Sequence, residues 1–149
     1  MNHSAMWGRF ATYLKWGTEF LFVDYFVLVT VAVLTGIAVT AFLQRPLAAA
    51  KRRRYDIVLV APFMAVPLIA LIAAVGAVPT RGPGPLAPPN TAALHTVDAV
   101  LICAAASWLL LLTIMKGRRW FVLSICLLNL WWLLGEAFIA GMALTGDWI

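Results

Sequence analysis

Long apolar runs separated by short polar segments dominate the pattern of this chain. Four runs of more than twenty residues each occupy residues 20–42, 57–78, 92–115 and 120–144. At about 1.5 Å of rise per residue, a helix of this length crosses a hydrocarbon core about 30 Å thick. A segment in lipid must satisfy its own backbone hydrogen bonds, so each run is predicted to be helical. The pattern therefore predicts an all-α, polytopic membrane protein, a four-transmembrane-helix bundle formed by one domain over residues 1–149.

A shorter amphipathic segment precedes the first run, over residues 5–17. Its apolar side chains recur at helical spacing, while charged and polar side chains occupy the rest of the helical wheel; the apolar set is Met6, Trp7, Phe10, Tyr13 and Leu14. This pattern is typical of a helix that lies in the headgroup region. We expect an interfacial anchor for the first span. A cleaved signal peptide is disfavoured, because the apolar run that follows has full spanning length.

Composition supports the membrane class and excludes a soluble one. Of 149 residues, 64% are hydrophobic and 11% are charged, and the mean hydropathy is +0.95. A soluble domain with a single core needs far more polar surface.

Basic residues predict the orientation. Eight of the eleven lie in two connections; they are Arg45, Lys51, Arg52, Arg53, Arg54, Lys116, Arg118 and Arg119. Both connections are expected on the cytoplasmic side of a bacterial inner membrane, with both termini outside, in the periplasm. The Lys51–Arg54 cluster is expected to contact anionic lipid headgroups, and no nucleic-acid partner is expected.

Three acidic residues lie inside apolar spans that contain no Lys or Arg: Asp24, Asp98 and Glu136. Helical rise places them about 10, 9 and 6 Å outward of their span midpoints. His95 shares a helix face with Asp98, and Asn129 shares one with Glu136. An unpaired carboxylate in hydrocarbon costs several kcal/mol. The sequence therefore predicts a common polar chamber formed by these five residues in the outer half of the bundle.

Three interpretations of this chamber remain open. The carboxyl groups act as hydrogen-bonded links between helices, or they exchange protons or bind a cationic substrate. Alternatively, His95, Asp98 and Glu136, with Asp24, supply nitrogen and oxygen ligands to a metal such as zinc, copper or iron, although this signal is weak.

Redox cofactors receive little support from the sequence. A b-type haem between helices needs two axial histidines, and the chain has only His3 in the N-terminal segment and His95 near the end of a span. A self-contained b-type haem is therefore not expected. Cys103 and Cys126 form no Cys-x-x-Cys pair and are expected to be small buried hydrophobes.

Two adjacent tryptophans, Trp131 and Trp132, lie near the middle of the last span, away from the interfaces where tryptophan is common. Adjacent residues point to different faces of a helix. We expect one indole to meet Glu136 or Asn129 and the other to contact a neighbouring subunit, lipid, quinone or pigment.

The leading functional hypothesis is a small non-catalytic accessory subunit of a larger membrane complex of respiratory, photosynthetic or oxidase type. It follows from the small extramembrane mass and the lack of a complete catalytic or haem constellation. The first alternative is a proton- or cation-coupled transporter that uses Glu136 and Asp98. The second is a metal-binding membrane enzyme of the outer leaflet.

Overall fold

The computed structural model describes residues 3–43, 58–78 and 88–146. Within these ranges all regular structure is helical. The elements in chain order are α1 (His3–Glu19), η1 (Phe20–Phe22), α2 (Asp24–Leu43), η2 (Ala61–Met64), α4 (Ala65–Gly76), α5 (Thr91–Ile114), η3 (Lys116–Arg118) and α6 (Arg119–Thr145).

Four segments of the described chain are long and apolar enough to cross a membrane. They are Phe26–Leu43, Val58–Gly76, Thr91–Ile114 and Arg119–Thr145. Three of them match the expected runs to within two residues at each end, whereas the first begins at Phe26 and not at residue 20, because the chain turns at η1. The prediction of an all-helical chain with four apolar helices of spanning length is therefore confirmed.

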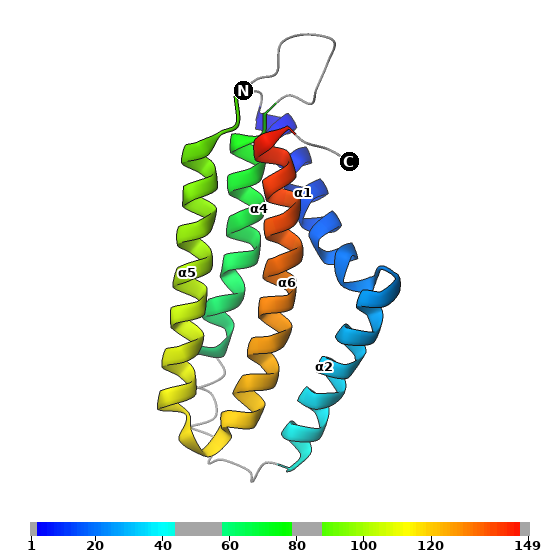
Figure 1. The fold of residues 1–149 in the computed structure, drawn as a ribbon, viewed down its shortest axis with the longest axis vertical. Coiled ribbons are helices and arrows are strands. Elements are labelled where there is room, and N and C mark those ends of the chain that lie inside the picture. Colours follow the sequence, from blue (N-terminus) through cyan, green and yellow to red (C-terminus); the bar gives the residue numbers. More distant parts are fainter. Residues whose placement is uncertain (1–2, 44–57, 79–87, 147–149) are drawn as a thin grey trace.

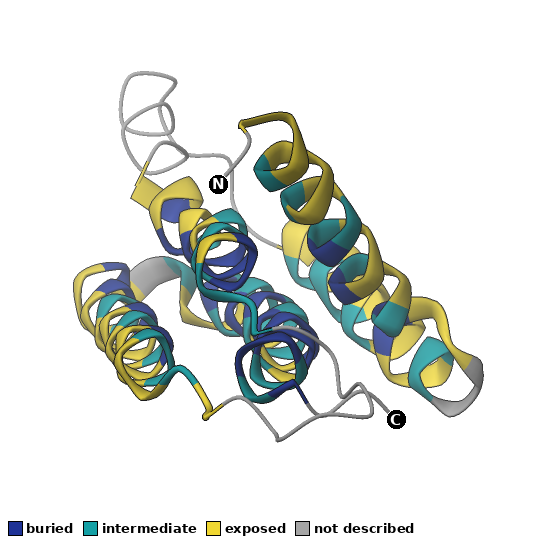
Figure 2. Cartoon of the chain, turned by 90° about the horizontal axis from the view of Figure 1, so that it is seen from above, coloured by how far each residue is buried: buried dark blue, intermediate teal, exposed yellow. Residues whose placement is uncertain are grey.

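Helix α6 is the centre of the bundle and contacts α1, α2, α4 and α5 (Figure 1). Its contact with α4 is close because small side chains meet there: Ala73 and Ala74 of α4, and Ala140 and Ala143 of α6, are all fully buried. Small residues let two helix backbones approach closely, which increases van der Waals contact. The buried positions accordingly concentrate on α4 and α6, whereas α5 and α2 show much exposed surface (Figure 2).

The first two helices form a bent pair. Helix α1 runs beside one half of α6, the chain turns at η1, and α2 continues beside the other half (Figure 1). Phe10, Tyr13 and Leu14 of α1 pack against the main apolar core. The prediction of a helix is confirmed, and part of its apolar stripe packs against other helices of the chain. These three residues face α4 and α6, whereas Trp7 of the same stripe is 50% exposed.

The ends of α4 and α5 are joined by one side chain. Asn90 caps α5 by accepting a hydrogen bond from the Ala93 backbone N–H at 3.1 Å, and its amide donates to the Gly76 carbonyl at 3.1 Å. A cap of this kind satisfies an otherwise unpaired N–H of the first helical turn. The same residue therefore begins α5 and holds it against the end of α4.

Candidate polar site on helix α6

Glu136 lies on the face of α6 that meets α1, and its side chain is 0% exposed. Neither carboxyl oxygen has a hydrogen-bond partner within the described structure. Burying a polar group without a partner costs on the order of 1–3 kcal/mol, and burying an unpaired charge costs more. Burial of Glu136 is therefore energetically costly.

Glycine makes the space that the Glu136 side chain occupies. A Cβ atom placed on Gly17 of α1 would collide with the Glu136 carboxyl group and would lie 3.2 Å from the Glu136 Cα atom. The preceding residue of α6 is also tight, since a Cβ on Gly135 would lie 3.1 Å from the Gly17 carbonyl oxygen and 2.8 Å from the Phe20 ring. Gly17 and Gly135 thus bring the two backbones together at the level of the carboxyl group.

No described basic residue neutralises Glu136. On α1, Lys15 pairs instead with Glu19 at 3.6 Å on an exposed surface, and Arg9 is also exposed. Helix α4 contains no titratable side chain. No cation and no hydrogen-bond donor of the described residues lies within bonding distance of its carboxyl group.

Asn129 lies two turns before Glu136 on α6 and is also 0% exposed. Its Oδ1 atom accepts a hydrogen bond of 2.8 Å from the Trp108 indole N–H of α5. Its Nδ2 group has no partner. The structure therefore gives Asn129 one structural role, the link to α5, and leaves its two amide protons available.

Trp131 and Trp132 are both half-buried, and both side chains contact other residues of the same chain. The Trp131 indole N–H donates to the Thr30 hydroxyl at 3.2 Å, and its ring lies 5.2 Å from that of Phe26. Trp132 packs against the main core, with its indole N–H buried and without a partner. Trp131 thus joins α6 to α2. The expectation that one indole hydrogen-bonds to Glu136 or Asn129 is not met among the described residues, because Asn129 pairs with Trp108 and the Glu136 oxygens have no partner.

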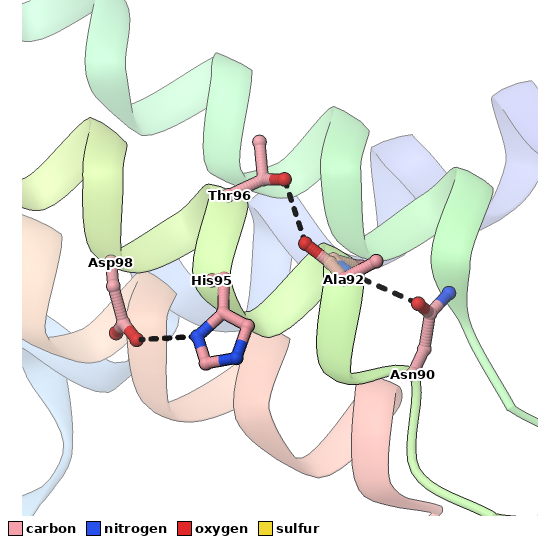
Figure 3. Close-up of polar contacts among 6 residues, drawn as sticks. Asn90, Ala92, His95, Thr96 and Asp98 are labelled. Atoms are coloured by element: carbon pink, nitrogen blue, oxygen red, sulfur yellow. Dashed lines mark hydrogen bonds and ion pairs between the residues drawn. The ribbon is translucent and has the colours of Figure 1, made fainter.

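His95 and Asp98 lie away from Glu136. Their side chains are 83% and 70% exposed, and the His95 Nδ1 atom lies 4.0 Å from an Asp98 carboxyl oxygen (Figure 3). Helix α5 packs on the bundle through another face, which carries Val97, Ala104 and Trp108.

The predicted common chamber therefore does not form among the described residues. Helical rise placed the acids at a similar depth, but depth does not determine the direction in which a side chain leaves its helix. Asp24 begins α2, but its side chain, like the whole of Lys51–Arg54, lies outside the described residues.

The arrangement of the described side chains does not support the metal-site hypothesis. Within the described part of the chain, no three His, Cys, Asp or Glu side chains lie close enough to hold a metal ion. His95 and Asp98 form a pair, but Glu136 lies elsewhere.

What the structure brings together instead is a stripe of unsatisfied polar groups on α6: the Asn129 amide, the Trp132 indole N–H and the Glu136 carboxyl group. Their spacing of three and four residues places them on one helix face over about 10 Å. The sequence pattern indicated Asn129 and Glu136 on this face. It did not indicate Gly17 or Trp108, because nothing in a single sequence shows which helices touch.

Comparisons with protein families, with curated proteins and with solved structures found no match to this chain. The functional conclusion therefore depends on the chemistry of the α6 stripe.

Proposed function

We propose that the protein is a small proton-coupled membrane transporter in which Glu136 takes up and releases the coupling proton. The observation that supports this most is the complete burial of Glu136 with both carboxyl oxygens unpartnered. Ionisable residues inside membrane helices are costly and mark proton or ion pathways more often than passive positions do. The sequence suggested that Glu136 and Asp98 act together in transport. The proposal now includes Glu136 alone, because the Asp98 side chain is exposed on another part of the bundle.

The rest of the stripe suits such a role. The Asn129 amide and the Trp132 indole are donors, and the Glu136 carboxyl group can both accept and donate. Water molecules or a small solute that entered beside α6 would find partners at three successive levels. A cationic solute that reached Glu136 would compete with the proton, because either one neutralises the carboxylate.

The proposed placement in the membrane follows the basic residues. Lys116, Arg118 and Arg119 lie at one end of the bundle, and α1 begins and α6 ends at the other (Figure 1). We assign the basic end to the cytoplasm and the other end to the outside of the inner membrane, which puts both termini outside.

The test uses purified protein in liposomes. The proton-exchanging group is identified by the infrared carboxyl band that changes when the external pH is stepped, and transport is followed as ethidium accumulation driven by an imposed pH gradient. We expect Glu136→Gln to remove both signals. Glu19→Gln and Asp98→Asn remove exposed acids and should retain both. If Glu136→Gln transports ethidium at the rate of the unmodified protein, Glu136 is not the coupling group. If the unmodified protein shows neither signal, the proposal is wrong.

A second candidate is the accessory subunit of a larger membrane complex. The observation that favours it is the surface of α2, because only 6% of the residues in its apolar segment Phe26–Leu43 are buried within the chain. Its exposed side chains include Leu28, Val31 and Phe42. Native electrophoresis of gently solubilised membranes should then show the protein migrating with a large complex. Migration as a monomer would count against this candidate and would leave the transporter proposal intact.

A further inference from the structure

A groove lies on the outer surface of the bundle where α5 ends and α6 begins, beside η3. It has a volume of about 580 Å³ and is lined by Leu109, Leu112, Thr113, Arg119, Trp120 and Leu123. The two helices lie side by side at this end of the molecule, which is opposite to the end where α1 begins (Figure 1). The groove is separate from the Glu136 stripe, and none of the stripe residues lines it.

The walls of the groove are apolar. Leu109 is 67% exposed and Trp120 is 75% exposed, so both present large hydrocarbon surfaces outward. On a helix that crosses a membrane such surfaces contact acyl chains, and tryptophan is favoured at the level of the headgroups. A hollow of this size between exposed leucines fits a length of acyl chain better than the flat side of a helix does.

The mouth of the groove is basic. Arg119 lines the groove, its side chain is exposed, and it forms no ion pair with any described residue. Lys116 lies three residues earlier and is exposed as well. The acidic residues with described side chains, Glu19, Asp98 and Glu136, all lie on other parts of the bundle. A positive charge at the end of an apolar groove is complementary to a phosphate attached to an acyl chain.

We propose that this groove binds one anionic phospholipid, with its phosphate on Arg119 and one acyl chain along Leu109, Leu112 and Leu123. A quinone would fill the apolar part but would leave the guanidinium group without a partner, and phosphatidylcholine would bring a quaternary ammonium group beside its phosphate. A second copy of the chain in the same orientation would bring no described carboxylate to Arg119. This site does not depend on the transport function proposed for Glu136.

The experiment measures lipid binding to the full chain in neutral detergent by native mass spectrometry, with phosphatidylglycerol and phosphatidylcholine as probes. We expect one phosphatidylglycerol to be retained in preference to phosphatidylcholine. Arg119→Gln should weaken phosphatidylglycerol binding about fivefold, the contribution typical of one basic residue at an anionic membrane surface. Leu109→Trp should weaken it as well, because the larger side chain fills the groove.

Two variants serve as matched controls. Arg9→Gln removes an exposed basic residue from α1 at the other end of the bundle, and Ile102→Trp adds the same bulk on α5 at a residue that is 69% exposed and does not line the groove. Both should bind phosphatidylglycerol as the unmodified protein does. Circular dichroism checks that all four variants keep their helix content.

Three outcomes would overturn the proposal. Equal retention of the two lipids would show that the groove holds generic annular lipid. Equal losses in Arg119→Gln and Arg9→Gln would show a diffuse effect of charge. The sequence predicted a buried Cys103, but it is exposed on α5, so the unmodified protein is the control for cross-linking. Disulfide-linked dimers formed in membranes by Leu109→Cys and not by the unmodified protein would show that a second copy covers the groove.

Discussion

The carboxyl group of Glu136 occupies the space in which a side chain at Gly17 would lie. The two residues lie more than one hundred positions apart in the chain, on α1 and α6. The position of each side chain depends on the other residue. Without a glycine at position 17, α1 could not reach α6 at this level. Without α1, the carboxyl group would be open to its surroundings.

The first prediction concerns this contact. Gly17→Ala should lower the free energy of unfolding by about 1–3 kcal/mol, because the added methyl group overpacks a close helix crossing. The measurement is a titration with sodium dodecyl sulfate followed by circular dichroism. Gly8→Ala on the same helix is the control, since a Cβ there meets nothing within 4 Å. That change should raise stability by up to about 1 kcal/mol through helix propensity.

Removal of the carboxyl group should partly rescue the Gly17→Ala protein. In the double variant Gly17→Ala/Glu136→Ala, the carboxyl clash is gone, but the new methyl group still lies 3.2 Å from the Cα atom of residue 136. Rescue is therefore expected to be incomplete. Strictly additive effects of the two changes would mean that the residues do not touch.

Sequence reasoning located the helices well because the signal for a spanning helix is local. A run such as residues 120–144 is apolar over its whole length, and the structure has α6 over Arg119–Thr145. The periodicity of residues 5–17 likewise indicated a helix, and α1 occupies His3–Glu19. Hydropathy could not tell whether the stripe with Phe10 and Tyr13 faces lipid headgroups or other helices, because both surfaces accept it.

The candidate site was harder to predict, since it depends on how each helix is rotated about its axis. Apolar residues occur on every face of a helix such as α5, so it has no strong polar and apolar sides. Asp98 and Glu136 could be placed at similar depth, but only the packing of α5 through Ala104 and Trp108 shows that Asp98 points outward. The contact between Gly17 and Glu136 is a tertiary contact, and the spacing of residues in the sequence does not predict it.

The second prediction concerns the energetic cost of Glu136. Glu136→Met keeps an unbranched stem and removes both unpartnered oxygens, so it should raise the free energy of unfolding by about 1–3 kcal/mol. The same variant should lose the pH-dependent infrared signal. Greater stability combined with lost proton exchange is expected of a group retained for function at the expense of stability. A clear loss of stability would instead indicate that the carboxyl group links helices.

The third prediction concerns the hydrogen bond of 2.8 Å between the Trp108 indole and the Asn129 amide. Each of Trp108→Phe and Asn129→Leu leaves one buried polar group unpaired and should lower the free energy of unfolding. The double variant should be less damaging than the sum of the two, with a coupling energy of about 1 kcal/mol, as is typical of hydrogen bonds between membrane helices. The four proteins are compared by the same detergent titration. A coupling energy of zero would mean that this bond contributes nothing to the α5–α6 contact.

The fourth prediction concerns Tyr13 of α1, which is 7% exposed. Burial raises the pKa of its hydroxyl above the ordinary value of 10.0, and the charge of Arg9 lowers it in part. Above pH 10 the unfolded chain therefore loses this proton while the folded chain keeps it. The stabilising contribution is complete below pH 10 and is lost as the pH rises towards the pKa of the folded state. The slope attributable to one group cannot exceed about 1.4 kcal/mol per pH unit.

This dependence can be isolated by comparing the unmodified protein with Tyr13→Phe between pH 9 and pH 11, values chosen to bracket the ordinary tyrosine pKa of about 10. The phenylalanine variant cannot ionise at this position, so its unfolding free energy should fall less steeply over the interval. Lys15 and the other titrating groups of α1 are common to both proteins and cancel in the difference. Parallel curves would mean that Tyr13 meets solvent equally in the folded and unfolded chain. In that case α1 would not be docked on α4 and α6, and the enclosure of Glu136 would be lost with it.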